Sequence, residues 1–66
     1  MPCAKRILEF LEENKRYSPK EIGQHIGINK QTVNNVLSVL YELGLVERPA
    51  RGIYMITAAG IKLLVN

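Results

Sequence analysis

Residues 18–43 read SPKEIGQHIGINKQTVNNVLSVLYEL, and this stretch carries the start and stop signals of two short helices. Ser18 is a suitable N-cap, Pro19 fits the first helical position, and Glu21 completes a capping box by reaching back to the Ser18 amide. Gly27 can supply the left-handed residue that a tight turn requires. We therefore predict a helix that starts at Pro19 and ends just before Gly27.

A second helix is predicted over about residues 30–43, with Asn29 as its N-cap and Gly44 as its stop. A helical wheel places the apolar side chains on one face: Val33, Val36, Leu37, Leu40 and Leu43. Of the two helices, we expect the core to include Ile22, Val33, Val36, Leu37 and Leu40. The opposite face carries uncharged hydrogen-bonding side chains, with a glutamate at its far end: Gln31, Asn34, Asn35, Ser38 and Glu42. This segregation predicts that the polar face contacts a polar partner.

The flanking segments complete the expected architecture. Apolar residues at helical spacing predict a first helix over about residues 3–14. After Gly44, strand-like runs at residues 45–47 and 53–56 enclose a loop at residues 48–52 that contains proline, glycine and two arginines. A last helix is expected over residues 58–65, with Ile61, Leu64 and Val65 on one side. Leu63 makes this helix more apolar than burial in so small a domain requires.

Composition limits the classes of protein that remain. The 66 residues predict a single domain over residues 1–66, and their 47% hydrophobic content is enough for a small core. Residues 15–66 carry a net charge of +4 and residues 1–14 carry −1, which gives the net +3 of the chain and fits a polyanionic partner for its later part. With one cysteine, one histidine and no aspartate, the chain lacks the residues for an intrachain disulfide, a cysteine-based zinc site or a catalytic constellation. Cys3 is then an idle thiol or an intermolecular bridge, and we expect neither enzyme activity nor a cofactor.

Three sequence segments resemble the winged helix-turn-helix transcriptional regulators of the MarR-like and PadR-like type. SPKEIGQHIG at residues 18–27 resembles the second helix and turn of that family, and VNNVLSVLYELGLVE at residues 33–47 resembles its recognition helix and following strand. YMITAAG at residues 54–60 resembles the family's conserved ending. The resemblance covers nearly the whole chain. It implies an α+β, mainly α fold of three helices, a β-hairpin wing and a C-terminal helix.

The resemblance also implies sequence-specific binding of double-stranded DNA, with the helix at about residues 30–43 in the major groove. The residues expected to contact base edges are Gln31, Asn34, Asn35 and Ser38. The residues expected to contact backbone phosphates, or to form the wing on the backbone or in the minor groove, are Lys15, Arg16, Lys20, Lys30, Arg48 and Arg51.

Two other uses of this fold stay open. A winged helix can serve as a protein-interaction module in a larger assembly, although that use favours an apolar recognition face. Domains that bind Z-form nucleic acid carry lysine, asparagine and tyrosine at spacings of four. Lys30 and Asn34 match the first two positions, but Ser38 stands in the third, and the chain has no tryptophan for the wing.

We expect a homodimer that pairs through the first helix and the C-terminal helix, since readers of this kind usually contact two half-sites. Neither a small-molecule effector site nor a membrane segment is evident. A cytoplasmic, nucleoid-associated regulator of prokaryotic or viral origin is expected. The residues do not distinguish a repressor from an activator.

Overall fold

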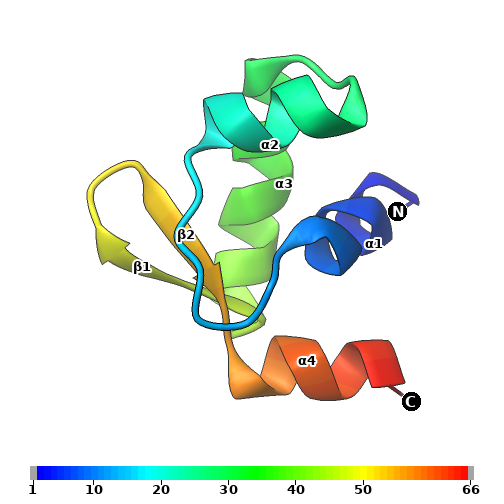
Figure 1. The fold of residues 1–66 in the computed structure, drawn as a ribbon, viewed down its shortest axis with the longest axis vertical. Helices are drawn as coiled ribbons and strands as arrows, with labels where there is room; N and C mark the ends of the chain where they lie inside the picture. The colour runs from blue at the N-terminus through cyan, green and yellow to red at the C-terminus, as the bar shows by residue number, and fades with distance from the viewer. Residues whose placement is uncertain (1, 66) are drawn as a thin grey trace.

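The computed structural model describes residues 2–65, which form four helices and a two-stranded antiparallel sheet (Figure 1). In chain order the elements are α1 (Pro2–Phe10), α2 (Pro19–Ile26), α3 (Lys30–Glu42), β1 (Val46–Ala50), β2 (Ile53–Ile56) and α4 (Ala58–Val65). The predicted order of three helices, hairpin and C-terminal helix is confirmed, and with it the winged helix-turn-helix fold.

The predicted ends of α2 and α3 are confirmed at the level of single hydrogen bonds. The Glu21 amide donates to Ser18 Oγ at 3.1 Å, and the Ser18 amide donates to Glu21 Oε1 at 2.9 Å, which is the capping box. Gly27 has a φ of 74°, the left-handed conformation that glycine adopts at little cost. Asn29 Oδ1 accepts from the Thr32 amide at 2.8 Å and caps α3. The turn between the two helices is therefore encoded locally.

The core lies where the first three helices meet the hairpin. Its buried side chains are Ile7, Leu8, Leu11, Ile22, Val33, Val36, Leu37, Leu40, Val46, Tyr54 and Ile56. The predicted core residues Ile22, Val33, Val36, Leu37 and Leu40 are thus confirmed as buried. Leu43, at the end of the apolar face of α3, is 65% exposed, because it is the C-cap beyond the last helical residue.

The first helix is shorter than predicted. It ends at Phe10 instead of extending to residue 14, and Asn14 has a φ of 64°. The reason is tertiary. The Tyr17 amide donates to the Tyr54 carbonyl at 3.0 Å and the Tyr54 amide donates back at 2.8 Å, so the chain must uncoil to reach β2. Asparagine is one of the few residues that tolerate the left-handed turn this return requires.

The hairpin loop is also shorter than the predicted loop at residues 48–52. Strand β1 continues to Ala50, which pairs with Ile53, so the turn consists of Arg51 and Gly52 alone. The register shifts by one residue between Glu47 and Ala50. Arg48 and Pro49 therefore lie opposite the single residue Tyr54, as in a β-bulge.

Pro49 is tolerated within β1 for two reasons. The strand lies at the edge of the sheet, where a residue without an amide proton is acceptable. In addition, the backbone groups of Tyr54 are already bonded to Tyr17 on the other side of β2. The sequence pattern suggested that the strand ends before Pro49, but β1 continues through it to Ala50.

Thr57 joins α4 to the end of α3, as an N-cap with a second hydrogen bond. Its Oγ1 accepts from the Gly60 amide at 3.1 Å and donates to the Gly44 carbonyl at 2.7 Å. Helix α4 packs against the core through Ile61 and Leu64. Val65, which the sequence places on the same side of the helix, is 76% exposed.

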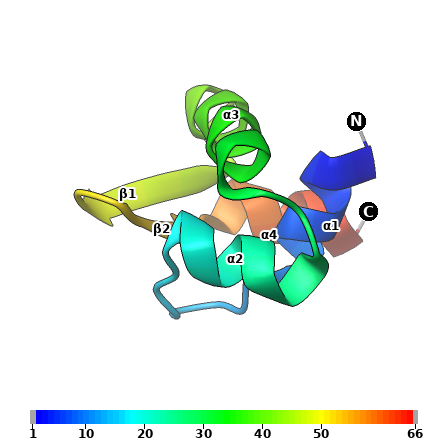
Figure 2. The same cartoon turned by 90° about the horizontal axis from the view of Figure 1, so that it is seen from above.

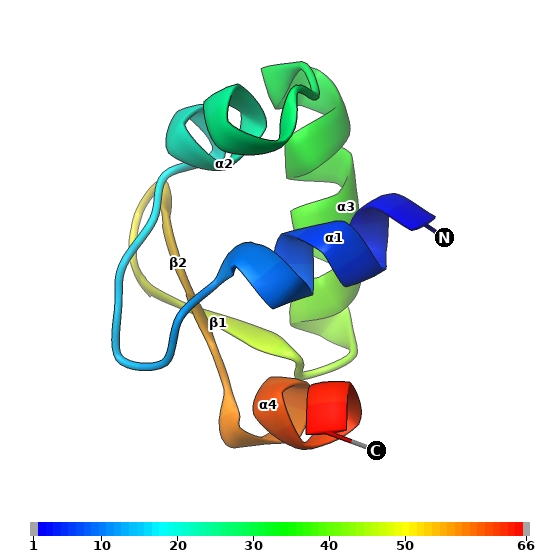
Figure 3. The same cartoon turned by 45° about the vertical axis from the view of Figure 1, so that its right-hand side comes forward.

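The hairpin and the terminal helices lie at opposite sides of the molecule (Figures 1 and 2). Helix α3 runs between them, with α2 across its N-terminal end and α4 near its C-terminal end (Figure 3). Both chain ends are on the side of α1 and α4, away from the hairpin. The fold therefore separates a face made by α3 and the hairpin from a face made by α1 and α4.

Candidate nucleic-acid interface

The crossing of α2 and α3 sets the orientation of the polar face of α3. At Gly23 a Cβ atom would lie 2.5 Å from the Ile28 carbonyl oxygen, so only glycine allows this close approach. The Gly23 carbonyl also accepts from the amides of Gly27 and Ile28, at 2.9 and 3.0 Å. A long-range hydrogen bond also connects α1 to the end of α2, because Arg6 Nη2 donates to the Ile26 carbonyl at 2.7 Å. The Arg6 contact could not be anticipated from the sequence, because it joins segments 20 residues apart.

The predicted base-contacting residues lie on the side of α3 that faces away from the core. Gln31, Asn35 and Ser38 are exposed, and Asn34 is half-buried. Ser38 Oγ donates to the Asn34 carbonyl at 3.0 Å, a local bond that leaves the hydroxyl oxygen able to accept from a ligand. The face therefore offers amide and hydroxyl groups of the kind that read base edges.

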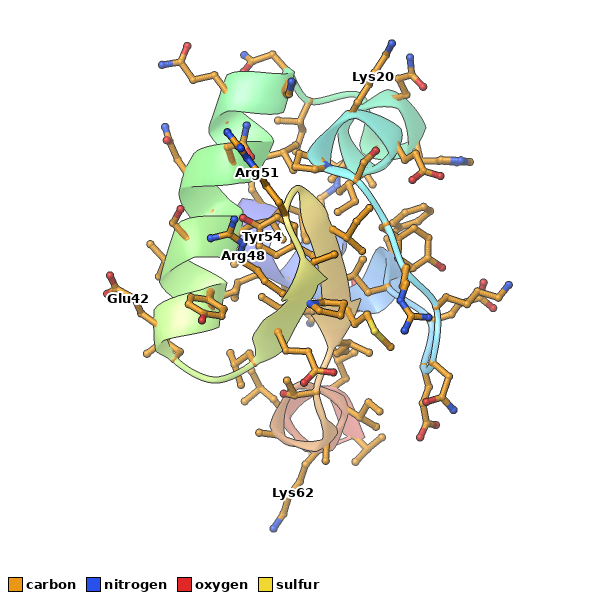
Figure 4. All side chains as sticks on the ribbon, turned by 90° about the vertical axis from the view of Figure 1, so that its left-hand side faces the viewer. Lys20, Glu42, Arg48, Arg51, Tyr54 and Lys62 are labelled. Carbon is orange, nitrogen blue, oxygen red and sulfur yellow. The ribbon has the colours of Figure 1, made fainter. Side chains whose placement is uncertain are left out.

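Arg48 lies on β1 and not in the loop, and this changes its surroundings. Its guanidinium carbon is 5.6 Å from the centre of the Tyr54 ring, within the range of a cation–π contact. Arg51 remains at the tip of the hairpin, in the two-residue turn. Both arginine side chains extend from the hairpin on the side of α3 (Figure 4).

A hollow of about 520 Å³ separates the hairpin from the first turns of α2 and α3. It is lined by Ser18, Pro19, Lys20, Lys30, Asn34, Arg48, Arg51, Gly52 and Tyr54. The structure thus brings together five of the predicted site residues from three separate parts of the chain. Tyr54 joins them, and sequence reasoning missed it because nothing in the β2 pattern shows that a bulge lies opposite.

Lys15 and Arg16 do not belong to this group. They lie in the loop between α1 and α2, and Lys15 Nζ is 3.0 Å from Glu12 Oε2. The hydrogen bond that Lys15 donates to Glu12, together with the negative charge of that carboxylate, raises the pKa of Lys15. The lysine is therefore charged at neutral pH but already paired, which makes it a weaker candidate for a phosphate contact than Lys20 or Lys30.

Glu42 marks the limit of the candidate surface. It is the last residue of α3, and its side chain points away from Arg48 and Arg51 (Figure 4). The cationic hollow is at the opposite, N-terminal end of the helix, where Lys30 is the first residue. An anionic ligand is therefore favoured near the start of α3 and disfavoured beside Glu42, while Arg48 and Arg51 also line a smaller hollow next to Tyr41.

A model of the MarR family matches residues 3–52, which include the first three helices and the hairpin as far as its turn. The chain belongs to the MarR family. No curated protein and no solved structure matches it. Membership of the MarR family identifies a winged-helix transcription regulator, from a family whose proteins bind DNA, usually as dimers, and are typically not enzymes.

Two further observations concern the residues that the structure describes. Within residues 2–65, no group of three or more potential metal ligands comes together. Over the same residues, this MarR-family chain has no helix with the length and apolar character needed to cross a membrane.

Proposed function

We propose that this MarR-family protein is a sequence-specific regulator that binds double-stranded DNA through α3 and the hairpin. In this proposal residues 1–66 act as one DNA-binding domain in the cytoplasm, where the nucleoid is. Helix α3 enters the major groove with its N-terminal half, and the hairpin lies on the backbone or in the adjacent minor groove. The main support for this proposal is the cationic hollow between α3 and the hairpin, which has no carboxylate in its lining.

Base reading is assigned to the exposed polar face of α3. Gln31, Asn34 and Asn35 carry amides that suit the N6 and N7 edge of adenine, and Ser38 can serve several bases. Lys30 and Lys20 stand at the starts of α3 and α2, where phosphate contacts are favoured. Arg51, at the turn, is the residue placed to reach beyond the backbone into a narrow groove.

We further propose that two copies pair through α1 and α4. An apolar groove of about 470 Å³ runs between these helices and the end of α3. It is lined by Ala4, Lys5, Leu8, Val39, Leu40, Leu43, Leu45, Leu63 and Leu64. Leu63 and Val65 expose 55% and 76% of their side chains, which is unfavourable unless another surface covers them.

The test is selection of bound duplexes from a random pool, followed by titration with salt. A paired reader should select two related half-sites spaced by about one DNA turn, 10–10.5 base pairs. The logarithm of the binding constant should fall linearly with the logarithm of salt concentration, with a slope of about −0.9 for each phosphate neutralised. Absence of duplex binding at low salt would reject the DNA proposal and favour the protein-interaction module.

A further inference from the structure

The gap between α3 and the hairpin has an unusual charge balance. Four cationic residues line it, one from α2, one from α3 and two from the hairpin: Lys20, Lys30, Arg48 and Arg51. No glutamate lines it, because Glu21 is held in the capping box and Glu47 lines a different hollow beside Met55. Within residues 2–65, none of the four cations forms an ion pair. The hollow therefore lacks an internal counterion.

The geometry of duplex DNA indicates what could occupy this gap. A major groove and the neighbouring minor groove are separated by one sugar-phosphate strand. If α3 lies in the major groove and the hairpin lies in or along the minor groove, that strand has to pass between them. The passage leads over the hollow lined by Lys30 and Asn34 on one side and by Arg48 and Arg51 on the other.

We propose that this hollow seats one phosphate of that strand, and that Tyr54 is the positioning residue that holds Arg48 over it. The proposal rests on the DNA-binding function proposed above and assigns a specific contact within it. A phosphodiester presents two non-bridging oxygens that share one negative charge, and the planar guanidinium of arginine can donate to both. The ligand is a backbone phosphate, so this contact fixes the register of the protein on DNA without reading a base.

Tyr54 is suited to the positioning role because its side chain and backbone are both held in place. Its side chain is only 7% exposed, and its backbone is bonded in both directions to Tyr17. The bulge in β1 places Arg48 opposite it, and the guanidinium lies over the ring. A bulge commonly re-aims a side chain in this way. A long arginine side chain is thus held in place before DNA arrives, so less conformational freedom is lost on binding.

The experiment uses the full chain and a duplex obtained by the selection described above. Each phosphate is replaced in turn by an uncharged methylphosphonate, and affinity is measured by fluorescence anisotropy. For the unaltered protein we expect at least one position per bound domain at which neutralisation weakens binding roughly tenfold or more, as for a charge-assisted hydrogen bond, and one such position should depend on Arg48. In Arg48→Met this position should lose its effect, and the salt slope should fall by about one.

Arg16→Met is the matched control. It makes the same chemical change at an exposed arginine outside the hollow. Arg16→Met can change the overall affinity for DNA. Replacing the seated phosphate by methylphosphonate should still weaken binding of this variant as much as it weakens binding of the unaltered protein. Melting curves of all variants show whether each is folded.

The role of Tyr54 is tested by a second series. Tyr54→Phe keeps the ring face and should keep the effect of neutralising the seated phosphate. Tyr54→Leu should weaken that effect while leaving the salt slope unchanged, because Arg48 keeps its charge, and it should have no further effect once Arg48 is replaced by methionine. If Tyr54→Leu does not fold, Arg48→Lys tests whether the planar guanidinium is needed. It keeps the charge but lacks the planar group, so it should bind less tightly with an unchanged salt slope.

Three results would overturn the assignment. A scan in which no phosphate stands out removes the seat, as does one in which every sensitive phosphate keeps its full effect in Arg48→Met. A flat scan together with thermal stabilisation by inorganic phosphate alone would make the hollow a site for a free anion instead. These results differ from failure to bind any duplex at low salt, which would reject the proposed function as well.

Discussion

At the scale of single residues, two glycines and a threonine set the positions of whole helices. Gly23 lets α2 approach the backbone at Ile28, and Gly60 lets α4 approach the backbone at Leu45. Thr57 joins the end of α3 to the start of α4 through its hydroxyl group. These residues touch no predicted DNA contact, yet they hold the elements that carry those contacts.

Gly60→Ala should destabilise the protein although alanine is the better helix former. A Cβ at this position would clash with the Leu45 carbonyl oxygen and lie 2.7 Å from Cγ1 of Ile56. Overpacking of this kind costs about 1–3 kcal/mol, and helix propensity returns at most about 1 kcal/mol. Urea unfolding should show a net loss. Ala59→Ser, an exposed change on the same helix, should stay within about 0.5 kcal/mol, and equal stability of the two variants would contradict the predicted clash.

Asn34→Ala should weaken binding to the selected duplex while leaving binding to random duplex nearly unchanged. The amide of Asn34 is assigned to a base edge, and a bidentate contact of this kind discriminates by about 1–3 kcal/mol. This corresponds to a loss of roughly 5- to 150-fold in competition assays. An equal loss on both duplexes would mean that Asn34 acts on the backbone and not on a base.

At the scale of elements, α3 has two electrostatically different ends. Lys30 begins the helix at the cationic hollow, and Glu42 ends it on the far side from the hairpin arginines. The hairpin arginines Arg48 and Arg51 line the hollow at the first of these ends, and they also line a smaller hollow beside Tyr41. The arrangement predicts that DNA engages the N-terminal half of the helix.

Lys30→Gln and Glu42→Gln make opposite one-unit changes of charge at the two ends of α3. The first should lower affinity for every duplex and reduce the salt slope by about one, because it removes a phosphate contact. The second should leave the salt slope unchanged, because Glu42 lies outside the groove. Removing a positive charge from a helix N-terminus does not destabilise the helix, so the Lys30 result reports binding. If Glu42→Gln raised the salt slope by as much as Lys30→Gln lowered it, both ends of the helix would lie close to phosphates, which would contradict binding through the N-terminal half alone.

At the scale of the whole molecule, the fold presents two unlike surfaces on opposite sides. The hairpin side is cationic and hollowed, whereas the side of α1 and α4 carries an apolar groove and exposed aliphatic residues. Two copies joined on the apolar side would leave both DNA-binding faces outward. A chain of 66 residues also has little core of its own, so pairing would add stability.

Leu63→Glu should convert the proposed dimer to a monomer. A charge placed in the apolar groove would be buried without a partner on association, which is strongly unfavourable. Light scattering should give twice the chain mass of 7.5 kDa for the unaltered protein and a single chain mass for the variant. Ala59→Glu adds the same charge to the exposed start of α4, outside the groove, and should remain dimeric. A single chain mass for the unaltered protein at micromolar concentration would reject pairing.

The features that sequence alone could predict are those that depend on neighbours in the chain. The capping box at Ser18 and Glu21, the left-handed Gly27 and the cap at Asn29 all involve residues no more than four apart. Helical periodicity likewise separated the core side of α3 from its polar side. The order of the elements, and hence the family resemblance, rests on such local signals, and that is why it could be read without coordinates.

The features that could not be predicted depend on contacts between distant segments. Helix α1 ends early because Tyr17 must pair with Tyr54, a partner 37 positions further along the chain. The same pairing occupies the Tyr54 backbone and lets Pro49 and Arg48 form a bulge, which turns an expected loop arginine into one held on an aromatic ring. Local propensity carries no information about these pairings. The polar face of α3 was therefore written in the sequence, whereas the cationic hollow beside it exists only because the folded chain brings three separate segments together.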